Sequence, residues 1–231
     1  MIKPITILST RRLQPDEAVS LTSAGLKVDH FDFIKRTVTL PVKREIVHHN
    51  IALTSQMAVE GWIALAGAWQ LQLKDYRFFC ISGATSKAAQ EQNLLIAGIG
   101  DNAEMLAEAI LLDSSVMEVT FLGGNRRLDI LPEKLRGRGV EVNELEVYRT
   151  ELVPVELIPP FDAVIFFSPS GVESYLKATP YRAAAVFCIG NTTGSYAREH
   201  GFSNVLVSPK PNMESLIGTI LHFYSNHRTH A

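Results

Sequence analysis

The sequence has little of what secreted, membrane-spanning or disulfide-stabilised proteins need. It contains two cysteines, Cys80 and Cys188, each inside an apolar run, which favours buried reduced thiols over a disulfide. No stretch reaches the roughly 18 to 20 apolar residues of a membrane span. The start, from Met1 to Leu8, has a short apolar run without a small-residue cleavage site, which predicts a first strand rather than an export signal. We therefore expect a cytoplasmic protein with no membrane partner.

The chain also lacks an excess of either charge. Its 22 Lys and Arg residues face 24 Asp and Glu residues, a formal net charge of −2. This balance argues against a protein that coats nucleic acid by bulk charge, so any anion site must be local. The histidines are scattered, and no Cys/His spacing is typical of zinc binding. We expect no nucleic-acid partner and no metal site, and the 46% of hydrophobic residues predicts a real core.

Short apolar runs bounded by turn residues alternate with amphipathic stretches of ten or more residues. This alternation is typical of βα units that build parallel sheets, and it predicts an α/β fold. The predicted strands are Ile5 to Ser9, Val28 to Phe33, Ile51 to Leu53, Phe78 to Ile81, Leu94 to Ala97, Val116 to Leu122, Val140 to Val147, Ala163 to Phe167, Ala184 to Ile189 and Val205 to Val207.

The two halves of the chain resemble each other, which indicates a duplication. Four segments match in the same order at spacings of 108 to 114, measured from Thr85 to Thr193 and from Gly25 to Gly139 at the two extremes. The matching pairs are Ala24 to Val28 with Arg138 to Val142, Ile51 to Glu60 with Val164 to Glu173, Phe79 to Thr85 with Phe187 to Thr193, and Asp101 to Leu106 with Pro211 to Leu216.

A duplication predicts two similar parallel-sheet domains of the flavodoxin or Rossmann-like kind, with equivalent turns after equivalent strands. Ligands of such sheets bind at the carboxyl ends of the strands, so two facing edges would make a cleft. The equivalent turns, at Thr54-Ser55 and Ser168 to Gly171 and at Ser82 to Thr85 and Gly190 to Thr193, are rich in hydroxyls and in free amides at a helix start. Such groups bind carboxylate or phosphate oxygens without any net positive charge.

Two other readings of these turns are weaker. Ser168 could be a nucleophile, but the chain has no Gly-x-Ser-x-Gly elbow, and a helix cap at Ser168 or Ser170 is the plain alternative. The run Gly98 to Ala103 fits a dinucleotide fingerprint after a strand. Its repeat counterpart has no such glycines, so we predict only a tight turn with a cap at Asp101 or Asn102.

Two kinds of residue near predicted strand ends remain open from the pattern alone. Arg11-Arg12 and Arg126-Arg127 follow strands at similar places in the two halves, and they either approach an acidic ligand or lie solvated on the surface. Tyr148 follows a long strand where the first half has Ile34. A tyrosine at such a place is often only a half-buried packing residue.

Several motifs together resemble the uroporphyrinogen-III synthase family over nearly the whole chain. The likeness is strongest in the second half and looser in the first, where Ser82 stands at a position that is usually glycine and Arg12 at a position that is commonly proline. The motifs are Thr10-Arg11, Val147 to Thr150, Phe166 to Val172 and Ile189 to Thr193.

The resemblance implies a swapped arrangement of two domains joined by a two-stranded linker. The expected domains are residues 1–35 plus 153–231, and residues 36–152. The segments Thr37 to Val42 and Glu151 to Val155 hold equivalent places and contain prolines, so we expect them to be the paired interdomain crossings. Tyr148 would then lie beside a hinge, next to the cleft.

The resemblance also implies an activity: a lyase that closes hydroxymethylbilane to uroporphyrinogen III, with loss of water, inversion of ring D through a spiro intermediate, and no cofactor. Tyr148 is the expected catalytic residue, assisting departure of the hydroxyl. We expect a monomer that binds this linear tetrapyrrole polycarboxylate. Its expected contacts are Arg11, Thr54, Ser55, Thr85, Ser168, Ser170, Gly171, Thr192 and Thr193.

The alternative is a two-lobed binding or sensor protein without catalysis. A sensor normally needs an output element, and the duplication already uses every segment of the chain. A flavodoxin-like redox protein is disfavoured because no turn is both phosphate-like and flanked by aromatic residues.

Overall fold

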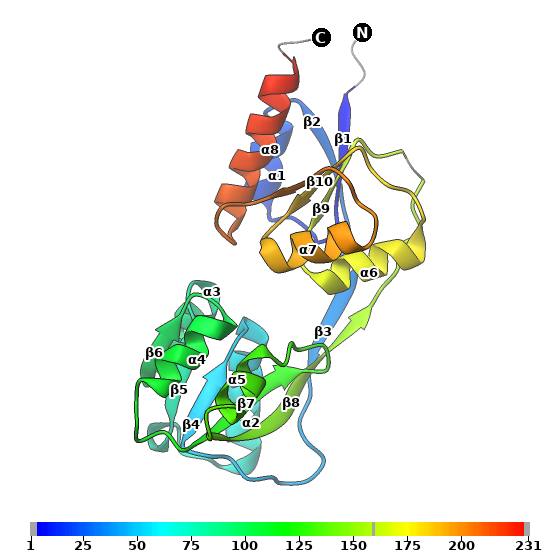
Figure 1. Ribbon diagram of the computed structural model, residues 1–231. Coiled ribbons are helices and arrows are strands. Elements are labelled where there is room, and N and C mark those ends of the chain that lie inside the picture. The colour runs from blue at the N-terminus through cyan, green and yellow to red at the C-terminus, as the bar shows by residue number, and fades with distance from the viewer. Residues whose placement is uncertain (1–3, 159, 229–231) are drawn as a thin grey trace. The chain divides into compact units, whose positions relative to one another are not determined.

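The computed structural model describes residues 4–158 and 160–228. The first predicted domain, 1–35 plus 153–231, therefore includes some residues outside the described part, namely 1–3, 159 and 229–231. The chain divides into two compact units (Figure 1). Unit 1 comprises Met1–Lys35 and Glu151–Ala231, and unit 2 comprises Arg36–Thr150. Each unit is an α/β layer structure with its own sheet, which confirms the predicted fold class.

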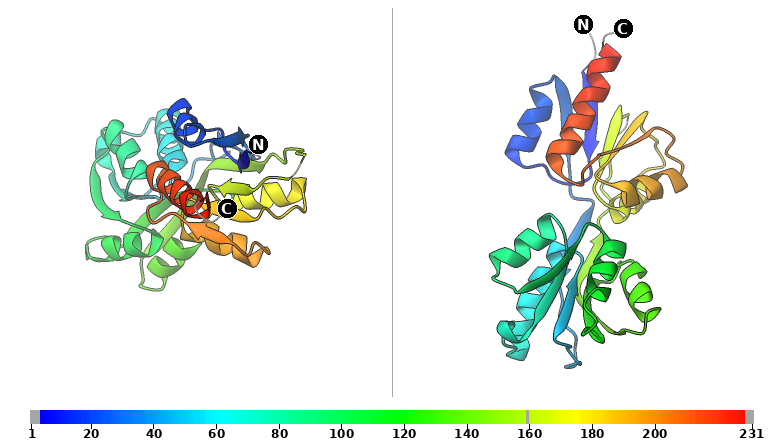
Figure 2. Two further views of the ribbon diagram at one scale, coloured as in Figure 1. Left: turned by 90° about the horizontal axis from the view of Figure 1, so that it is seen from above. Right: turned by 60° about the vertical axis from the view of Figure 1, so that its left-hand side comes forward.

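Unit 1 has a five-stranded sheet in the order β11-β10-β9-β1-β2. All four neighbouring pairs are parallel. Helices α1 and α8 pack beside each other over one core cluster, and α6 and α7 over a second one, so both faces of the sheet are covered (Figure 2). The elements are β1 (Ile5–Ser9), α1 (Pro15–Thr22), β2 (Leu26–His30), β9 (Ala163–Phe166), α6 (Pro169–Ala178), β10 (Ala185–Cys188), α7 (Asn191–Glu199), β11 (Val205–Val207) and α8 (Met213–Arg228).

Unit 2 contains most of a six-stranded sheet in the order β3-β8-β7-β4-β5-β6, in which the first two residues of β3 and the last two of β8 belong to unit 1. The five strands from β8 to β6 are parallel. Helices α2 and α3 contact each other, as do α4 and α5, and each pair belongs to a separate core cluster. The elements are β3 (Ile34–Val38), β4 (Asn50–Leu53), α2 (Gln56–Trp69), a short 3-10 helix (Leu73–Asp75), β5 (Arg77–Ile81), α3 (Ala84–Glu91), β6 (Ile96–Gly100), α4 (Ala103–Leu111), β7 (Glu118–Gly124), α5 (Ile130–Arg136) and β8 (Glu141–Leu152).

The two sheets have the same strand order once the halves of the sequence are matched. Strands β9, β10 and β11 correspond to β4, β5 and β6, and β1 and β2 correspond to β7 and β8. Each sheet therefore takes one βαβ segment from one half of the sequence and three strands from the other half, and β3 adds a sixth strand to the sheet of unit 2. This exchange supports the predicted duplication, because two unrelated segments would have no reason to share this order.

Helix starts follow the local signals in the sequence. Pro15 occupies the first turn of α1, and the Asn102 and Asn212 side chains accept hydrogen bonds from Met105 N and Ser215 N at 3.0 and 2.9 Å. The expectation of a cap at the end of the Gly98 to Ala103 run is thus confirmed for Asn102.

The paired segments that link the units differ from those predicted. Thr39 N donates to Val147 O, and Val153 N donates to Phe33 O, both at 2.9 Å. As residue numbers rise on one segment they fall on the other, so the segments are antiparallel. The predicted ranges, 37–42 and 151–155, lie a few residues too far along the chain. Each predicted range overlaps its paired segment and contains a proline, Pro41 or Pro154, which lacks an N–H group and stands just beyond the ladder.

Candidate functional site

Four of the predicted site residues lie in unit 2, at the carboxyl edge of its sheet. Thr54 and Ser55 directly follow β4, Thr85 lies in the first turn of α3 after β5, and Tyr148 lies in β8. The chain order of the strands reverses between β4 and β7, which is the position where open parallel sheets bind ligands.

Ser55 connects the start of helix α2 to Tyr148. It is the N-cap residue of α2, and its Oγ accepts a hydrogen bond from Ala58 N at 3.2 Å. The same hydroxyl donates to the Tyr148 Oη at 3.3 Å. The structure thus brings together a cap residue and a phenol that are 93 positions apart in the sequence.

Two glycines make room for the strand that carries Tyr148. An added Cβ at Gly124 would lie 2.3 Å from Cε2 of the Tyr148 ring, and one at Gly61 would lie 2.5 Å from Cγ2 of Val147. The pairing of β7 with β8 shifts register at Gly124, which lies opposite Tyr148. The Tyr148 ring therefore rests against the backbone of β7, in a space that a side chain at position 124 would fill.

The second turn of unit 2 is built differently from its predicted counterpart. Its helix cap is Gly83, with φ of 81°, a conformation that favours glycine. Ser82 precedes the cap, and its Oγ donates to Asp101 Oδ1 of the next turn at 2.9 Å. Thr85 is 6% exposed, so the polar surface of this turn comes mainly from its backbone and from Ser82.

In unit 1 the first hydroxyl turn repeats the cap of unit 2. Ser168 is the N-cap residue of α6, and its Oγ accepts from Gly171 N at 3.1 Å. A Cβ added to Gly171 would lie 3.4 Å from Oγ1 of Thr10, so this turn lies directly beside the end of β1. Ser170, in the first turn of α6, is partly exposed.

The second turn of unit 1 begins helix α7. Gly190 is its N-cap residue and has an extended backbone with φ of −169°. Thr192 is exposed, whereas Thr193 is only 4% exposed. Of the two predicted threonine contacts here, Thr192 therefore offers the accessible side chain.

Arg11 is already paired within unit 1. Its Nη2 atom lies 2.9 and 2.8 Å from the two carboxylate oxygens of Glu17, and its guanidinium lies 4.5 Å from the ring centre of Phe167. The Glu17 carboxylate neutralises part of the charge that Arg11 would offer to an anion. Arg12 pairs with Asp32, and Arg127 with Glu144, so the second arginine of each predicted pair also has an acidic neighbour.

The structure thus gathers the predicted residues in two sets. One set, in unit 2, comprises Thr54, Ser55, Thr85 and Tyr148; the other, in unit 1, comprises Arg11, Ser168, Ser170, Gly171, Thr192 and Thr193. Apart from Tyr148, which lies within β8, the residues of each set follow a parallel strand or lie in the first turn of the helix that comes after it.

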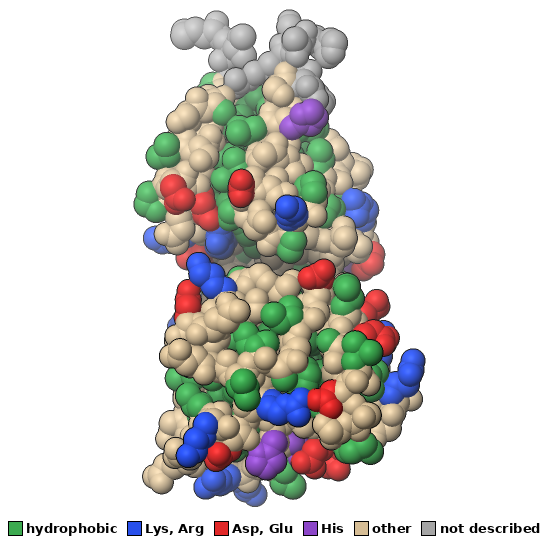
Figure 3. Space-filling view, turned by 90° about the vertical axis from the view of Figure 1, so that its left-hand side faces the viewer, with side chains coloured by type: hydrophobic (Ala, Val, Ile, Leu, Met, Phe, Trp, Pro, Cys, Tyr) green, Lys and Arg blue, Asp and Glu red, His purple; other side chains and the backbone are tan. Residues whose placement is uncertain are grey.

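Groups outside these sets add little reactive chemistry. Burial raises the pKa of the Cys80 and Cys188 thiols to about 12, so both stay protonated near neutral pH. Both cysteines are free and buried, as predicted. In residues 4–158 and 160–228 no group of three or more His, Cys, Asp or Glu side chains could hold a metal ion. Positive and negative side chains are interspersed over the face shown in Figure 3.

Sequence reasoning missed the residues that support the predicted ones, namely Gly124 beneath Tyr148 and Glu17 beside Arg11. The Gly123-Gly124 pair at the end of a strand was a visible signal, because glycine at such a place often marks a close approach. Glu17, by contrast, was visible only as an acid in a first helical turn.

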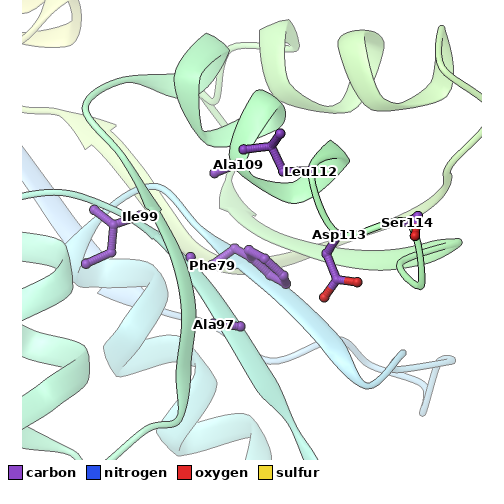
Figure 4. Close-up of a pocket in the computed structure, with 8 residues that line it drawn as sticks. Phe79, Ala97, Ile99, Ala109, Leu112, Asp113 and Ser114 are labelled. Atoms are coloured by element: carbon purple, nitrogen blue, oxygen red, sulfur yellow. The ribbon is translucent and has the colours of Figure 1, made fainter.

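A separate groove of about 560 Å³ lies in unit 2, away from the predicted residues. Five of its eight lining residues have apolar side chains, and Ile99 lies at one side with Asp113 and Ser114 at the other (Figure 4). Asp113 is already engaged by Arg77 and by the Ser115 hydroxyl. The groove therefore has few free polar groups with which to orient a ligand.

Fold and turns together define a class: an α/β protein of two parallel-sheet units, each with hydroxyl-rich, capped turns at the carboxyl ends of its strands. Residues 18–218 match the family model described as Uroporphyrinogen-III synthase HemD. This match covers most of the chain, and the protein belongs to the uroporphyrinogen-III synthase family. Membership favours the enzyme over a binding or sensor protein without catalysis.

Curated relatives and solved structures agree with this assignment. The chain is 28% identical to uroporphyrinogen-III synthase of Saccharomyces cerevisiae over 85% of this chain and 83% of that protein. It is 30% identical to the Schizosaccharomyces pombe enzyme over 52% and 50%. The solved structure of the Helicobacter pylori enzyme matches with a TM-score of 0.68 and 18% identity, over 96% of this chain and all of that chain. A mutant of the Thermus thermophilus enzyme has the same TM-score at 14% identity, over 97% and 99%. These two structures support the fold.

Proposed function

We propose that the protein closes hydroxymethylbilane to uroporphyrinogen III, losing water and inverting ring D through a spiro intermediate, without a cofactor. Family membership over residues 18–218 carries this proposal. The geometry of unit 2 supports it, because the phenol of Tyr148 lies at the carboxyl edge of the sheet beside the hydroxyl of Ser55.

The two sets of turn residues suit a substrate with many carboxylates. Ser and Thr hydroxyls and first-turn amides donate hydrogen bonds to carboxylate oxygens without a concentrated positive charge. We assign substrate contacts to Thr54, Ser55 and Thr85 in unit 2, and to Arg11, Ser168, Ser170, Gly171, Thr192 and Thr193 in unit 1. The proposal requires that both domains, predicted as residues 1–35 plus 153–231 and as residues 36–152, contact one substrate in a cleft between them.

Catalysis then has two parts. Holding the flexible chain curled brings its ends together in the inverted sense and keeps it from the spontaneous, uninverted closure. Tyr148 assists departure of the hydroxyl as a hydrogen-bond donor or general acid, and the substituted carbon of the last ring attacks the resulting azafulvene.

The expected setting is a cytoplasmic monomer. In the part of the chain that the structure describes, no helix has both the length and the apolar character of a membrane span. The balanced charge gives no reason to expect a nucleic-acid partner. Solution scattering with and without product tests both the monomer and the cleft, because closure of two units on a ligand reduces the radius of gyration. Equal radii would contradict closure.

The decisive experiment supplies freshly generated hydroxymethylbilane to the purified protein and separates the type III from the type I product. We expect type III to dominate and to increase with enzyme concentration. Type I product alone, at the rate of a blank without enzyme, would refute the proposed function.

A further inference from the structure

The hydrogen bond between Ser55 and Tyr148 has a direction that affects the phenol proton. A serine hydroxyl has one proton to donate and two lone pairs to accept with. Ser55 Oγ uses a lone pair for the Ala58 N–H at 3.2 Å, and donates its proton to the Tyr148 Oη at 3.3 Å. With Ser55 as the donor, the phenol oxygen is an acceptor toward the protein, and its own proton remains available to another group.

We propose that Ser55 and Gly124 are positioning residues that hold Tyr148 with its phenol proton directed to the departing hydroxyl of the substrate. This inference rests on the proposed function and refines it. It gives Ser55 a role through Tyr148, in addition to the substrate contact proposed above.

Helix α2 strengthens this arrangement electrostatically. The helix runs for 14 residues from Gln56, and its first-turn N–H groups carry a partial positive charge. Ser55, as the cap, stands between that helix end and the phenol. Negative charge that builds up on the phenol oxygen during proton transfer is therefore stabilised by the Ser55 donor and by the helix behind it.

Gly124 fixes the other side of the ring. An added Cβ would lie 2.3, 2.6 and 2.8 Å from the ring atoms Cε2, Cζ and Cδ2 of Tyr148, so the ring lies directly over the strand backbone. Val147, the preceding residue, is fully buried, and its side chain occupies the space left by Gly61. Backbone and ring are therefore both held, which leaves the hydroxyl of Tyr148 little choice of position.

The step balances as follows. The phenol proton moves from Tyr148 Oη to the substrate hydroxyl oxygen, the carbon–oxygen bond breaks with its electron pair on that oxygen, and water leaves. A cationic azafulvene and a phenolate remain. The proton released by the substrate after ring closure restores the phenol.

A double-mutant cycle on the full-length protein tests the inference, using kcat for type III product in Ser55→Ala, Tyr148→Phe and the double variant. We expect Tyr148→Phe to lower kcat by tens-fold or more, near the low end of the general-acid range. Ser55→Ala should lower kcat about five- to tenfold, the rate factor of a single hydrogen bond, with a smaller change in KM. In the Tyr148→Phe background, Ser55→Ala should leave kcat unchanged.

Two controls separate positioning from capping. Asn102 caps helix α4 by the same kind of bond, to Met105 N, without touching Tyr148. Asn102→Ala should therefore match the stability loss of Ser55→Ala and leave kcat unchanged. Ser55→Thr, which retains both the cap and the hydroxyl, should restore kcat.

The outcomes are distinct. If Ser55→Ala lowers kcat by the same factor in both backgrounds, or if Tyr148→Phe has no effect while the parent protein makes type III product, the positioning role is wrong and the proposed function stands. A parent protein without type III product would overturn both.

Discussion

The two units have sheets of similar strand order and equivalent serine caps, but only unit 2 has a tyrosine, Tyr148, beside its serine cap. Ser55 in unit 2 and Ser168 in unit 1 cap equivalent helices with bonds of 3.2 and 3.1 Å to the amide three residues on. Beside Ser55 stands Tyr148, whereas the spacing of 114 that relates Gly25 to Gly139 places Ile34 at the equivalent position of unit 1. The hydroxyl-bearing caps therefore occur in both units, whereas the candidate general acid, Tyr148, occurs only in unit 2.

The residue beneath the phenol ring also differs between the two units. The same spacing relates Gly124 to Thr10, and Thr10 O accepts a hydrogen bond from Phe33 N, next to Ile34. Thr10 also donates its Oγ1 proton to Ile165 O at 2.8 Å. The position that Gly124 holds in unit 2 is thus taken in unit 1 by a residue with a side chain, which donates a hydrogen bond to the neighbouring strand β9.

The largest expected effect is on turnover, and it tests whether the Tyr148 hydroxyl contributes more to turnover than the Tyr196 hydroxyl of unit 1 does. Tyr148→Phe should lower turnover by tens-fold or more with the fold intact, as loss of a general acid does. Tyr196→Phe in unit 1, where the ring stacks on His200 with centroids 4.1 Å apart, should leave turnover unchanged. Turnover of both variants is measured by type III product formation, with circular dichroism as the check on folding. Equal turnover in Tyr148→Phe and parent would contradict the acid role.

The next effect compares two glycines at equivalent edges of the sheets. Gly124→Ala should lower the free energy of unfolding by about 1 to 3 kcal/mol, because its Cβ overlaps the Tyr148 ring. Gly171→Ala should change it by less than about 0.5 kcal/mol, because its Cβ meets atoms no closer than 3.4 Å. Urea unfolding measures both. Equal losses would show that the ring moves aside without cost.

A smaller effect compares the two serine caps. Ser55→Ala and Ser168→Ala should each lower the free energy of unfolding by about 1 kcal/mol, the usual cost of losing a cap. The two values should agree because the bond lengths agree. A clearly larger loss at Ser55 would mean that its bond to Tyr148 also stabilises the fold.

The smallest expected effect is a loss of stability at acid pH that we attribute to Asp113 in unit 2. Hydrogen bonds from Ser115, and then the Arg77 side chain, lower the pKa of the Asp113 carboxyl from 3.8 to about 2. Because the folded pKa is lower than the unfolded one, this stabilisation is present above about pH 4 and is lost as the pH falls to about 2. Asp113→Asn should flatten the fall in unfolding free energy over this window, measured by urea unfolding at several pH values.

The equivalent place in unit 1 has no such ion pair, because the spacing of 108 relates Arg77 to Ala185. A slope unchanged by Asp113→Asn would place the sensitivity elsewhere.

Local patterns in the sequence were sufficient to predict much of the fold. The alternation of apolar runs and amphipathic stretches predicted parallel sheets, and the cap at Asn102 was predicted, with Asp101 as the alternative, from residue type. The predicted bounds of this strand were wrong at both ends, since β2 covers Leu26–His30 where Val28 to Phe33 was expected. Apolar character alone predicted strand through Phe33, but Phe33 is buried beyond the point where the ladder of β2 ends.

By itself the sequence determined the α/β class, the duplication and the hydroxyl-rich turns, because these depend on periodicity and on residue types close together in the chain. Only the tertiary structure decided that Ser55 donates to Tyr148, that Gly124 makes room for its ring, and that Arg11 is paired with Glu17. The physical reason is that hydrogen-bond direction, close contact and charge pairing depend on where side chains meet in space. A residue pattern cannot specify such meetings between β4, β7 and β8, which lie far apart in the chain and side by side in the sheet.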